Sequence, residues 1–336
     1  MSGHRALHGL LPPGGTDGWE RPIYSHNPSP MPSNAASMRP QPVAAPNRAH
    51  ANLKGIGWMV LAMATFAVED ALVKRAARDL PIAQVLMLFG AGGALLFGAW
   101  GLRSPSPLFH PDVRSPAMGI RALFEITGRL FYVLAIALTP LSSATAILQA
   151  TPVLVVLGAK VFFNERVGWR RWCAVAMGMT GVLIVLKPAS SDFSWLSLLT
   201  VIGLVGFAGR DLASRAVPAT LGTRHLGFYG FLTVVVAGAL YAPWEARPFV
   251  LPSGPLALVL VAAFAVGALA YAALMKAMRT GDIAAVTPFR YSRLLFGVGL
   301  GALVFGEGVS ARMALGCGVI LAAGLLIAWD GWRRHR

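Results

Sequence analysis

The stretch FNERVGWR, residues 163–170, returns 142 positions later as FGEGVSAR, residues 305–312. The two copies share four positions, which are Phe163, Glu165, Val167 and Arg170 in the first and Phe305, Glu307, Val309 and Arg312 in the second. In both copies the motif ends one long apolar segment and begins the next. The pattern indicates an internal duplication of the chain.

A second set of residues repeats at nearly the same distance. This set contains Phe66, Ala67, Asp70 and Lys74, which are followed 141 positions later by Phe207, Ala208, Asp211 and Arg215. Identity between the two halves is low elsewhere, so the match is one of pattern.

The composition is that of a membrane protein. Only 13% of the residues are charged and 56% are apolar, against about a quarter and about half in soluble domains, and the mean hydropathy is +0.62. The net charge of +15 resides in short gaps between apolar runs, which is typical of cytoplasmic loops and not of a surface that binds nucleic acid. The two cysteines, Cys173 and Cys317, lie in apolar segments and indicate neither a disulfide framework nor a metal site.

Residues 1–53 are rich in proline and contain no apolar run long enough for a signal peptide. We expect a disordered cytoplasmic tail there, and a short basic cytoplasmic C-terminus at 331–336. A helix that spans a membrane needs about 20 apolar residues, and we look for such runs between the two tails. We expect ten such helices, at 55–74, 82–101, 117–138, 142–163, 170–187, 195–214, 225–243, 255–276, 283–306 and 311–330.

The connections between these segments are short, which predicts that consecutive helices lie side by side as antiparallel pairs. Lys and Arg are more frequent in the loops on the side of the N-terminus, so both termini are expected in the cytoplasm. Five helices per repeat would insert the second half upside down. The predicted fold is an all-α integral membrane protein of two inverted repeats, at 54–188 and 195–330, as in many secondary transporters.

Ionisable residues inside spanning helices cost about 2.5–3.5 kcal/mol each and therefore need a partner, a cavity or a task. Arg121, Glu125 and Arg129 are spaced by four and stack on one face of the third segment. They predict either a ladder that binds a polar substrate or carries a proton, or an internal stack of salt bridges.

Arg290 and Arg293 lie three residues apart in the ninth segment, after Pro288. They could form a fork for a carboxylate or a phosphate, or pair with Glu125 or Asp211 of other helices. The fourth segment has a similar interruption at Thr151 and Pro152, just after Gln149, which suggests matching broken helices.

Glu69 with Asp70, and Arg210 with Asp211, occupy corresponding places in the two halves. A carboxylate at this depth is a candidate proton carrier because burial favours its neutral form. The alternative is pairing with Lys74 and Arg215, one turn further on. Glu165 and Glu307 lie at helix ends, and we interpret them as structural closures of the helix hairpins.

Aromatic residues within the spans could stack on a flat substrate. The candidate substrate-binding residues are Arg121, Glu125, Arg129, Gln149, Tyr271, Arg290, Tyr291 and Arg293, and the candidate proton-coupling residues are Glu69, Asp70 and Asp211. We expect no catalytic residue, no cofactor and no metal.

The two stretches LTPLSSATAILQATPVLVVLGAKVFFNERVGWRRW, residues 138–172, and AMRTGDIAAVTPFRYSRLLFGVGLGALVFGEGV, residues 277–309, resemble the EamA type of the drug/metabolite transporter superfamily. The resemblance covers about residues 54–330. It implies a secondary carrier without an ATP-hydrolysing part, from a family whose members move amino acids, nucleosides, drugs, S-adenosylmethionine or riboflavin.

We therefore expect a multi-pass inner-membrane carrier, working by alternating access, for a small anionic or zwitterionic metabolite, such as S-adenosylmethionine, riboflavin or an amino-acid-like compound. The expected partners are this substrate and membrane lipid, with no nucleic acid and with a homodimer as an open alternative. Two other classes remain: a lipid-modifying membrane enzyme, which would need a cluster of His, Asp or Glu at a membrane face, and a channel.

Overall fold

The computed structural model describes one all-helical unit of the protein, within residues 46–336. The described residues are 48–101, 107–163, 168–186, 194–278, 280 and 286–334. The first helix begins at Arg48, inside the segment expected as a tail, and residues 1–47 lie outside the described part. At the other end the last helix continues to Arg334, into the segment expected as a basic C-terminus.

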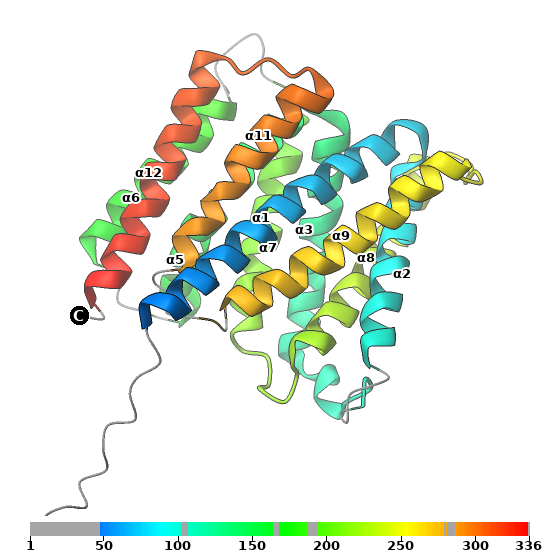
Figure 1. Cartoon of the computed structure of the whole chain (residues 1–336), viewed down its shortest axis with the longest axis horizontal. Helices are drawn as coiled ribbons and strands as arrows, with labels where there is room; N and C mark the ends of the chain where they lie inside the picture. Colours follow the sequence, from blue (N-terminus) through cyan, green and yellow to red (C-terminus); the bar gives the residue numbers. More distant parts are fainter. Residues whose placement is uncertain are drawn as a thin grey trace, which may run out of the picture. The chain divides into compact units, whose positions relative to one another are not determined.

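Each of the ten expected spans contains a helix (Figure 1). The helices are α1 (Arg48–Asp79), α2 (Ile82–Gly101), α3 (Pro116–Leu138), α4 (Leu141–Leu148), α5 (Thr151–Phe163), α6 (Trp169–Leu186), α7 (Ser197–Ser214), α8 (Thr223–Glu245), α9 (Gly254–Met278), α11 (Ser292–Phe305) and α12 (Ala311–Arg334), with the 3-10 turns η2 (Pro111–Arg114) and η3 (Thr287–Tyr291).

Proline and glycine set several of the helix ends. Pro116 occupies the first turn of α3, where a missing N–H costs nothing. Pro140 precedes α4 and prevents α3 from continuing into it. Gly306 follows α11 with a φ of 66°, a left-handed conformation that ends the helix and suits glycine. The expected hairpins between apolar segments are therefore built from local sequence.

Six of the described helical segments are long and apolar enough to cross a membrane by length and composition. They are His50–Asp79, Ile82–Trp100, Leu141–Phe162, Ser197–Ser214, Thr223–Glu245 and Gly254–Met278. Helix α3 has the length but carries Arg121, Glu125 and Arg129. The apolar parts of α6 and α12 are shorter, at Trp172–Val185 and Ala311–Leu326.

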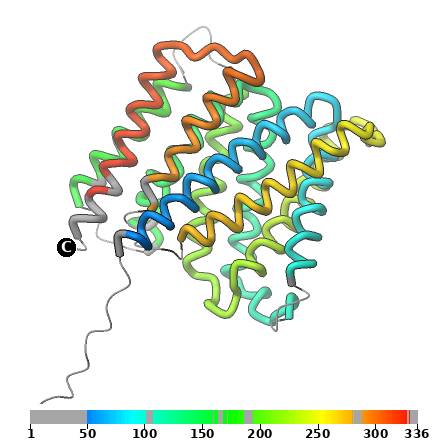
Figure 2. The backbone as a smooth tube through the Cα atoms, viewed as in Figure 1, coloured from blue at the N-terminus to red at the C-terminus, as the bar shows by residue number. Residues whose placement is uncertain are grey.

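The main helix pairs join distant parts of the sequence, so the expectation that consecutive helices pair was wrong. Helix α1 packs along α9, α2 along α8, α3 along α7 and α6 along α12. Figure 2 shows α1 running between α9 and α11, far from them in sequence. Short loops only limit how far apart consecutive helices can lie. Which helices pack together depends on the shape and polarity of their surfaces, and here the helix surfaces fit those of helices in the other half.

Glycine allows the closest of these contacts. A Cβ atom on Gly206 of α7 would lie 2.3 Å from the backbone nitrogen of Gly128 on α3, so the two backbones touch there. The small-xxx-small pair Gly297 and Gly301 of α11 is also used within the chain, because Gly297 packs on Thr145 and Gly301 on Ser142, both of α4.

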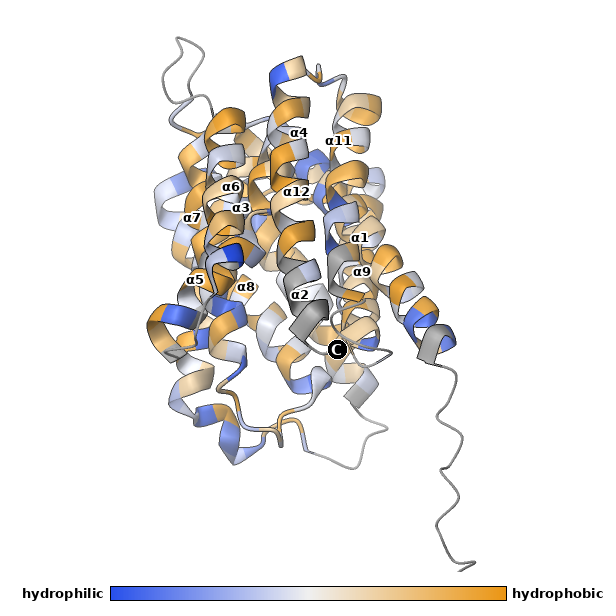
Figure 3. Ribbon diagram, turned by 90° about the vertical axis from the view of Figure 1, so that its left-hand side faces the viewer, coloured by the Kyte–Doolittle hydropathy of each residue, from blue (hydrophilic) through white to orange (hydrophobic). Residues whose placement is uncertain are grey.

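The outer surface is apolar, as a bilayer requires. Figure 3 shows that apolar residues predominate along the helices, and many large apolar side chains are exposed, such as Leu303 on α11 at 87%. Exposed tryptophans lie near helix ends, where they suit the membrane–water interface; they include Trp100, Trp169, Trp195 and Trp244.

Candidate functional site

Charged side chains gather in the interior of the helix bundle. In the described part of the chain they are Glu69 and Asp70 of α1, Arg121, Glu125 and Arg129 of α3, Arg210 and Asp211 of α7, Arg290 of η3 and Arg293 of α11. This set contains five arginines and four carboxylates. All the candidate ionisable residues predicted from the sequence belong to it.

Two ion pairs hold α1 to its neighbours. An Nη1 of Arg129 lies 2.7 Å from Oε1 of Glu69, and an Nη2 of Arg293 lies 2.6 Å from Oδ2 of Asp70. The Tyr132 hydroxyl also donates to that Asp70 oxygen, at 3.0 Å. Both carboxylate side chains are only 1% exposed. Such buried, hydrogen-bonded pairs are costly to break, so we read them as fixed contacts.

These contacts correct two expectations from the sequence. Arg129 was expected to share a ladder with Glu125, yet it reaches across to Glu69 of α1. The first span was expected to end at residue 74, but α1 continues to Asp79, so Glu69 and Asp70 lie well inside the helix. Spacing along one helix identifies neighbours on the same helix only, and here the partners come from other helices.

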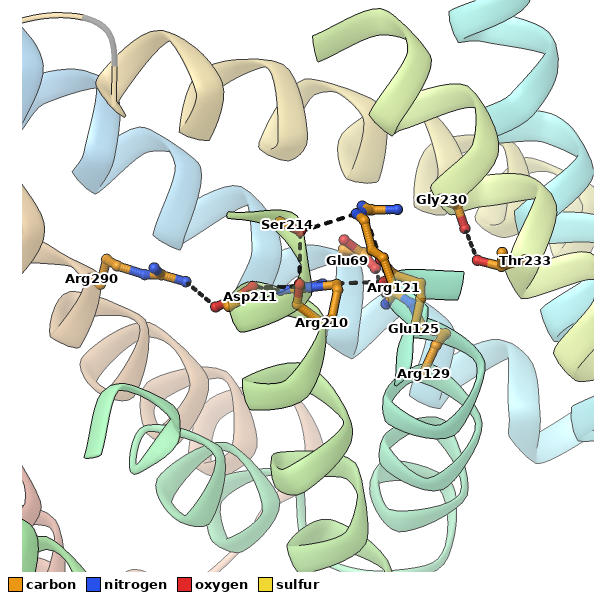
Figure 4. Close-up of polar contacts among 10 residues, drawn as sticks. All are labelled: Glu69, Arg121, Glu125, Arg129, Arg210, Asp211, Ser214, Gly230, Thr233 and Arg290. Atoms are coloured by element: carbon orange, nitrogen blue, oxygen red, sulfur yellow. Dashed lines mark hydrogen bonds and ion pairs between the residues drawn. The ribbon is translucent and has the colours of Figure 1, made fainter. Parts of the chain in front are cut away.

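The remaining charges form a row of alternating sign across three elements (Figure 4). Arg121 lies 3.2 Å from Oε2 of Glu125, whose Oε1 lies 3.1 Å from Arg210. Arg210 also donates to Oδ1 of Asp211 through Nε at 3.0 Å and Nη2 at 2.9 Å. Oδ2 of Asp211 faces Arg290 at 3.7 Å. We call this series the charge row; it has an arginine at each end.

The serine Ser214 fixes one end of the charge row. Its hydroxyl accepts a hydrogen bond from Nε of Arg121 at 3.1 Å and donates to the backbone carbonyl of Arg210 at 2.7 Å. Arg121 is therefore held by both α3 and α7, and its side chain is 3% exposed. The other end, Arg290, has a side chain that is 29% exposed.

A cavity of about 80 Å³ lies beside the charge row. Its polar and aromatic lining comes from Phe66, Arg129, Tyr132, Gln149, Thr151, Phe207, Arg210, Arg290, Tyr291 and Arg293, and its remaining lining from Met63, Leu148, Pro152 and Leu274. The charged residues among these are all arginines. Pockets for drug-sized ligands measure about 300–1,000 Å³, so the cavity would have to widen to admit a ligand of that size.

Two of the lining arginines stack on aromatic rings at corresponding positions of the two halves. The guanidinium of Arg293 lies 5.1 Å from the ring centre of Phe66, and that of Arg210 lies 4.8 Å from Phe207, 141 positions later than Phe66. Cation–π contacts of this kind stabilise a charge without neutralising it. Each of these two arginines is thus held by an aromatic ring as well as by its carboxylate partners.

Two helix interruptions meet at the cavity. Between α4 and α5 the helix breaks at Gln149 and Ala150, and between η3 and α11 the geometry changes at Tyr291. Gln149 and Tyr291 are 142 positions apart, so the breaks are in register although Pro152 and Pro288 are not. Nε2 of Gln149 donates to the carbonyl of Arg290 at 3.0 Å, which joins the two breaks directly.

The predicted substrate-binding residues divide by position. Arg129, Gln149, Arg290, Tyr291 and Arg293 line the cavity. Arg121 and Glu125 lie behind it in the charge row.

The two predicted tyrosines also contact neighbouring helices. The ring of Tyr291 packs against Gly324 of α12, where a Cβ atom would lie 1.8 Å from Cζ. Tyr271 of α9 contacts Phe97 edge-on, at 5.6 Å between ring centres.

Arg210, Phe66, Tyr132 and Phe207 were not among the predicted site residues, yet they line the cavity. The signal for three of them was present in the sequence: Phe66 and Phe207 are equivalent in the duplication, and Arg210 occupies the place of Glu69. Opposite charges at equivalent positions are hard to interpret without knowing that α3 offers Arg129 to one and Glu125 to the other.

A separate cluster closes the turn between α3 and α4. The oxygens of Glu307 accept hydrogen bonds from the N–H groups of Leu141 and Ser142, at 2.7 and 2.9 Å, at the N-terminus of α4. Lys74 lies 3.6 Å from Glu307 and donates to the carbonyls of Ile136 and Thr139. Glu307 thus closes a helix end, and Lys74 does not pair with Asp70. Glu165, its sequence counterpart, lies outside the described residues.

Comparisons with known proteins agree with this architecture. Residues 53–187 match the EamA-like transporter family. A riboflavin transporter of Rhizobium johnstonii is 29% identical over 84% of this chain and 93% of its own length. An S-adenosylmethionine uptake transporter of Rickettsia felis is 25% identical over 83% of this chain and 93% of its own. A pseudopaline exporter of Pseudomonas aeruginosa is 29% identical over 80% of this chain and 93% of its own.

A solved crystal structure superposes with a TM-score of 0.55 at 20% identity, over 86% of this chain and 100% of the other, which shows a shared fold. The helical fold is that of a multi-pass membrane protein, and these relatives are named as transporters of small molecules. The chain is therefore similar to the EamA-like transporter family of the drug/metabolite transporter superfamily, with the family match covering residues 53–187.

Proposed function

We propose that the protein is a secondary active transporter that moves a small anionic or zwitterionic metabolite across the inner membrane by alternating access. The two moving parts are inverted repeats at 54–188 and 195–330, and the cargo binds in the arginine-lined cavity between them. The candidate substrate-binding residues are Arg129, Gln149, Arg290, Tyr291 and Arg293, supported by Arg121, Glu125 and Tyr271 beside the cavity.

The observation that carries the proposal is the charge of the row beside the cavity. Once Arg129 is paired with Glu69 and Arg293 with Asp70, three arginines share the two carboxylates of the charge row. One positive charge is therefore left over, at the edge of the cavity. A carboxylate or phosphate of the cargo would neutralise it, and the neighbouring aromatic rings suit a cargo with a flat apolar part.

The inverted repeat is supported by how the helices pair. With five spans per half, α1 corresponds to α7 and α3 to α9, so the pair α1–α9 is the counterpart of the pair α7–α3. The other two close pairs, α2–α8 and α6–α12, each join a helix to its own counterpart. A two-fold relation between halves produces this pattern, and the breaks at Gln149 and Tyr291 lie where such an axis would bring them together.

The placement in the membrane rests on the same layout. The start of α1 and the end of α12 lie at the same end of the bundle (Figures 1 and 3), in line with cytoplasmic termini, a cytoplasmic tail and an even number of crossings. The relatives suggest the compounds to test: riboflavin, S-adenosylmethionine and pseudopaline. The arginine-lined cavity favours the compounds that carry a carboxylate.

The proposal is tested by transport into proteoliposomes that contain the purified protein. Labelled riboflavin, S-adenosylmethionine and amino acids are supplied first, together with any compound that accumulates or disappears in cells lacking the protein. We expect saturable uptake of an anionic or zwitterionic compound. A conductance without saturation would indicate a channel instead.

Two variants connect that transport to the site. Arg290→Ala and Glu125→Gln should abolish uptake while membrane insertion stays normal. Arg75→Ala serves as the control, because Arg75 is an exposed arginine of α1 that pairs with Asp79 away from the cavity. Normal uptake by both site variants would exclude the charge row from function.

A further inference from the structure

The ion pair between Asp211 and Arg290 differs from the other cross-helix pairs among the charged residues of the described interior cluster, which measure 2.6–3.1 Å. Its N–O distance is 3.7 Å, beyond hydrogen-bonding range, and its two side chains are 25% and 29% exposed. The pair of Arg293 with Asp70, which is the counterpart of Asp211 in the first half, measures 2.6 Å with a carboxylate 1% exposed. Equivalent carboxylates of the two halves are thus held very differently.

The two oxygens of Asp211 have separate partners. Oδ1 accepts both hydrogen bonds from Arg210, at 2.9 and 3.0 Å, while Oδ2 faces Arg290. If Arg290 moved away, Asp211 would keep both bonds to Arg210. Asp70, by contrast, would lose its charged partner Arg293 and keep the neutral Tyr132 hydroxyl. Release of Arg290 from Asp211 is therefore the least costly separation among these contacts.

The position of Arg290 allows its side chain to leave Asp211 and contact a ligand in the cavity. Its backbone carbonyl is fixed by Gln149, and the residue lines the cavity, whereas Asp211 does not. Only the guanidinium has to turn for the side chain to exchange one carboxylate for another. An incoming carboxylate could approach within hydrogen-bonding distance, which the 3.7 Å contact with Asp211 does not reach.

We propose that the carboxylate of Asp211 is a built-in substitute for the anionic group of the cargo. In the unloaded carrier it neutralises Arg290, and it gives up that arginine when a carboxylate or phosphate of the cargo binds. This inference rests on the proposed transport function. It assigns Asp211 the role of a competitor that sets affinity, while Asp70 and Glu69 hold the helices in place.

The arrangement has a consequence for the transport cycle. A carrier that delivers its cargo must return empty, and a bare guanidinium in a closing cavity would oppose that step because desolvation of an unpaired charge is costly. Asp211 supplies the missing negative charge for the return. The guanidinium of Arg290 then has a carboxylate partner in both the loaded and the unloaded form, so both forms can close.

The exchangeable pair can be tested without knowing the cargo, with phenylglyoxal, which modifies accessible arginine side chains. The full-length protein in detergent is treated for increasing times, and modification of each arginine is followed by peptide mass spectrometry. In the wild type we expect Arg290 to react faster than Arg293. Asp211→Asn should increase the Arg290 rate about fivefold, the factor expected for removal of a weak, partly exposed ion pair.

Asp70→Asn is the matched control, because it removes the equivalent carboxylate of the first half. It should leave the Arg290 rate within about twofold of the wild type, the scatter expected for sites that do not share a partner. Asp211→Glu is a second variant with the opposite expected effect on the modification rate of Arg290. The longer side chain can reach Arg290 and should slow its modification.

Equal rates at Arg290 in the wild type, Asp211→Asn and Asp211→Glu would overturn the proposal, as would protection of Arg290 equal to that of Arg293. If one Asp211 variant is not monodisperse, the proposal is judged by the other variant and by the rates of Arg290 and Arg293 in the wild type. Because the assay uses no transport measurement, its failure would not affect the proposed function. Absence of transport together with the expected rates would instead leave the ion pair intact and reject the carrier.

Discussion

Replacement of Glu307 by glutamine removes one negative charge from the cluster at the α3–α4 turn while keeping the size of the side chain. In the wild type the carboxylate accepts hydrogen bonds from the N–H groups of Leu141 and Ser142 and from the Ser142 hydroxyl, the last at 2.7 Å. It also lies 3.6 Å from Lys74, with both side chains about nine-tenths buried. The variant therefore loses an anionic helix cap and leaves a buried lysine without its carboxylate.

The expected cost follows from these contacts. A hydrogen bond to a charged group contributes about 1.5–3 kcal/mol, and removal of one partner from a buried ion pair costs about 3–5 kcal/mol. Lys74 keeps its hydrogen bonds to the carbonyls of Ile136 and Thr139, at 2.8 and 2.6 Å, which offsets part of the cost of breaking the ion pair. We expect Glu307→Gln to lower the free energy of unfolding by about 3 kcal/mol in total.

The chain offers a matched control in Glu245. Its carboxylate caps α2 in the same way, accepting from the N–H groups of Ile82 and Ala83 at 2.7 and 2.8 Å. Its cationic neighbour Arg247 is 4.0 Å away and 53% exposed, so no buried charge is stranded. Glu245→Gln should cost only about 1 kcal/mol, the usual value of a helix cap.

The assay is the free energy of unfolding in lipid–detergent mixed micelles, titrated with a denaturing detergent and followed by tryptophan fluorescence. Lys74→Met combined with Glu307→Gln should recover part of the loss, because the unpaired charge is then absent. Equal costs for the Glu307 and Glu245 variants, or no recovery in the double variant, would refute the reasoning.

Two further outcomes are expected. Gly206→Ala should destabilise the protein by about 1–3 kcal/mol through its collision with Gly128 on α3, whereas Gly299→Ala, with open space around it, should not; both are measured by the same titration. Asp211→Asn should retain exchange of cargo across proteoliposomes but lower net uptake about tenfold, because the empty carrier closes over an unpaired Arg290; equal loss of both modes would contradict this.

Much of the fold could be read from the sequence because helices are local structures. Runs of about 20 apolar residues between prolines and glycines placed the helices well, and the interruption after Gln149 was recognised from Thr151 and Pro152. Helix α1 was drawn too short because its two ends, beyond Lys54 and Lys74, are polar while still favouring a helix.

The site was predicted less completely because its contacts are not local. The contact of Arg121 with Glu125 follows from their spacing of four residues. Arg129 and Lys74 also had partners four residues away, but packing brought Glu69 and Glu307 closer, and no periodicity in one helix encodes that choice. The sequence predicts which residues need a partner; the pairing of α1 with α9 and of α3 with α7 determines which partner they find.

The central claim is that the two halves lie in the membrane with opposite orientation, and cysteine labelling tests it most directly. Cys173 and Cys317 are first replaced by alanine, and single cysteines are then introduced at Arg114, before α3, or at Ser253, before α9; both positions are exposed. These helices are counterparts in the two halves. A membrane-impermeant maleimide added to spheroplasts should label the cysteine at 253 at once and the cysteine at 114 only after permeabilisation. Labelling of both from the same side would contradict the inverted repeat.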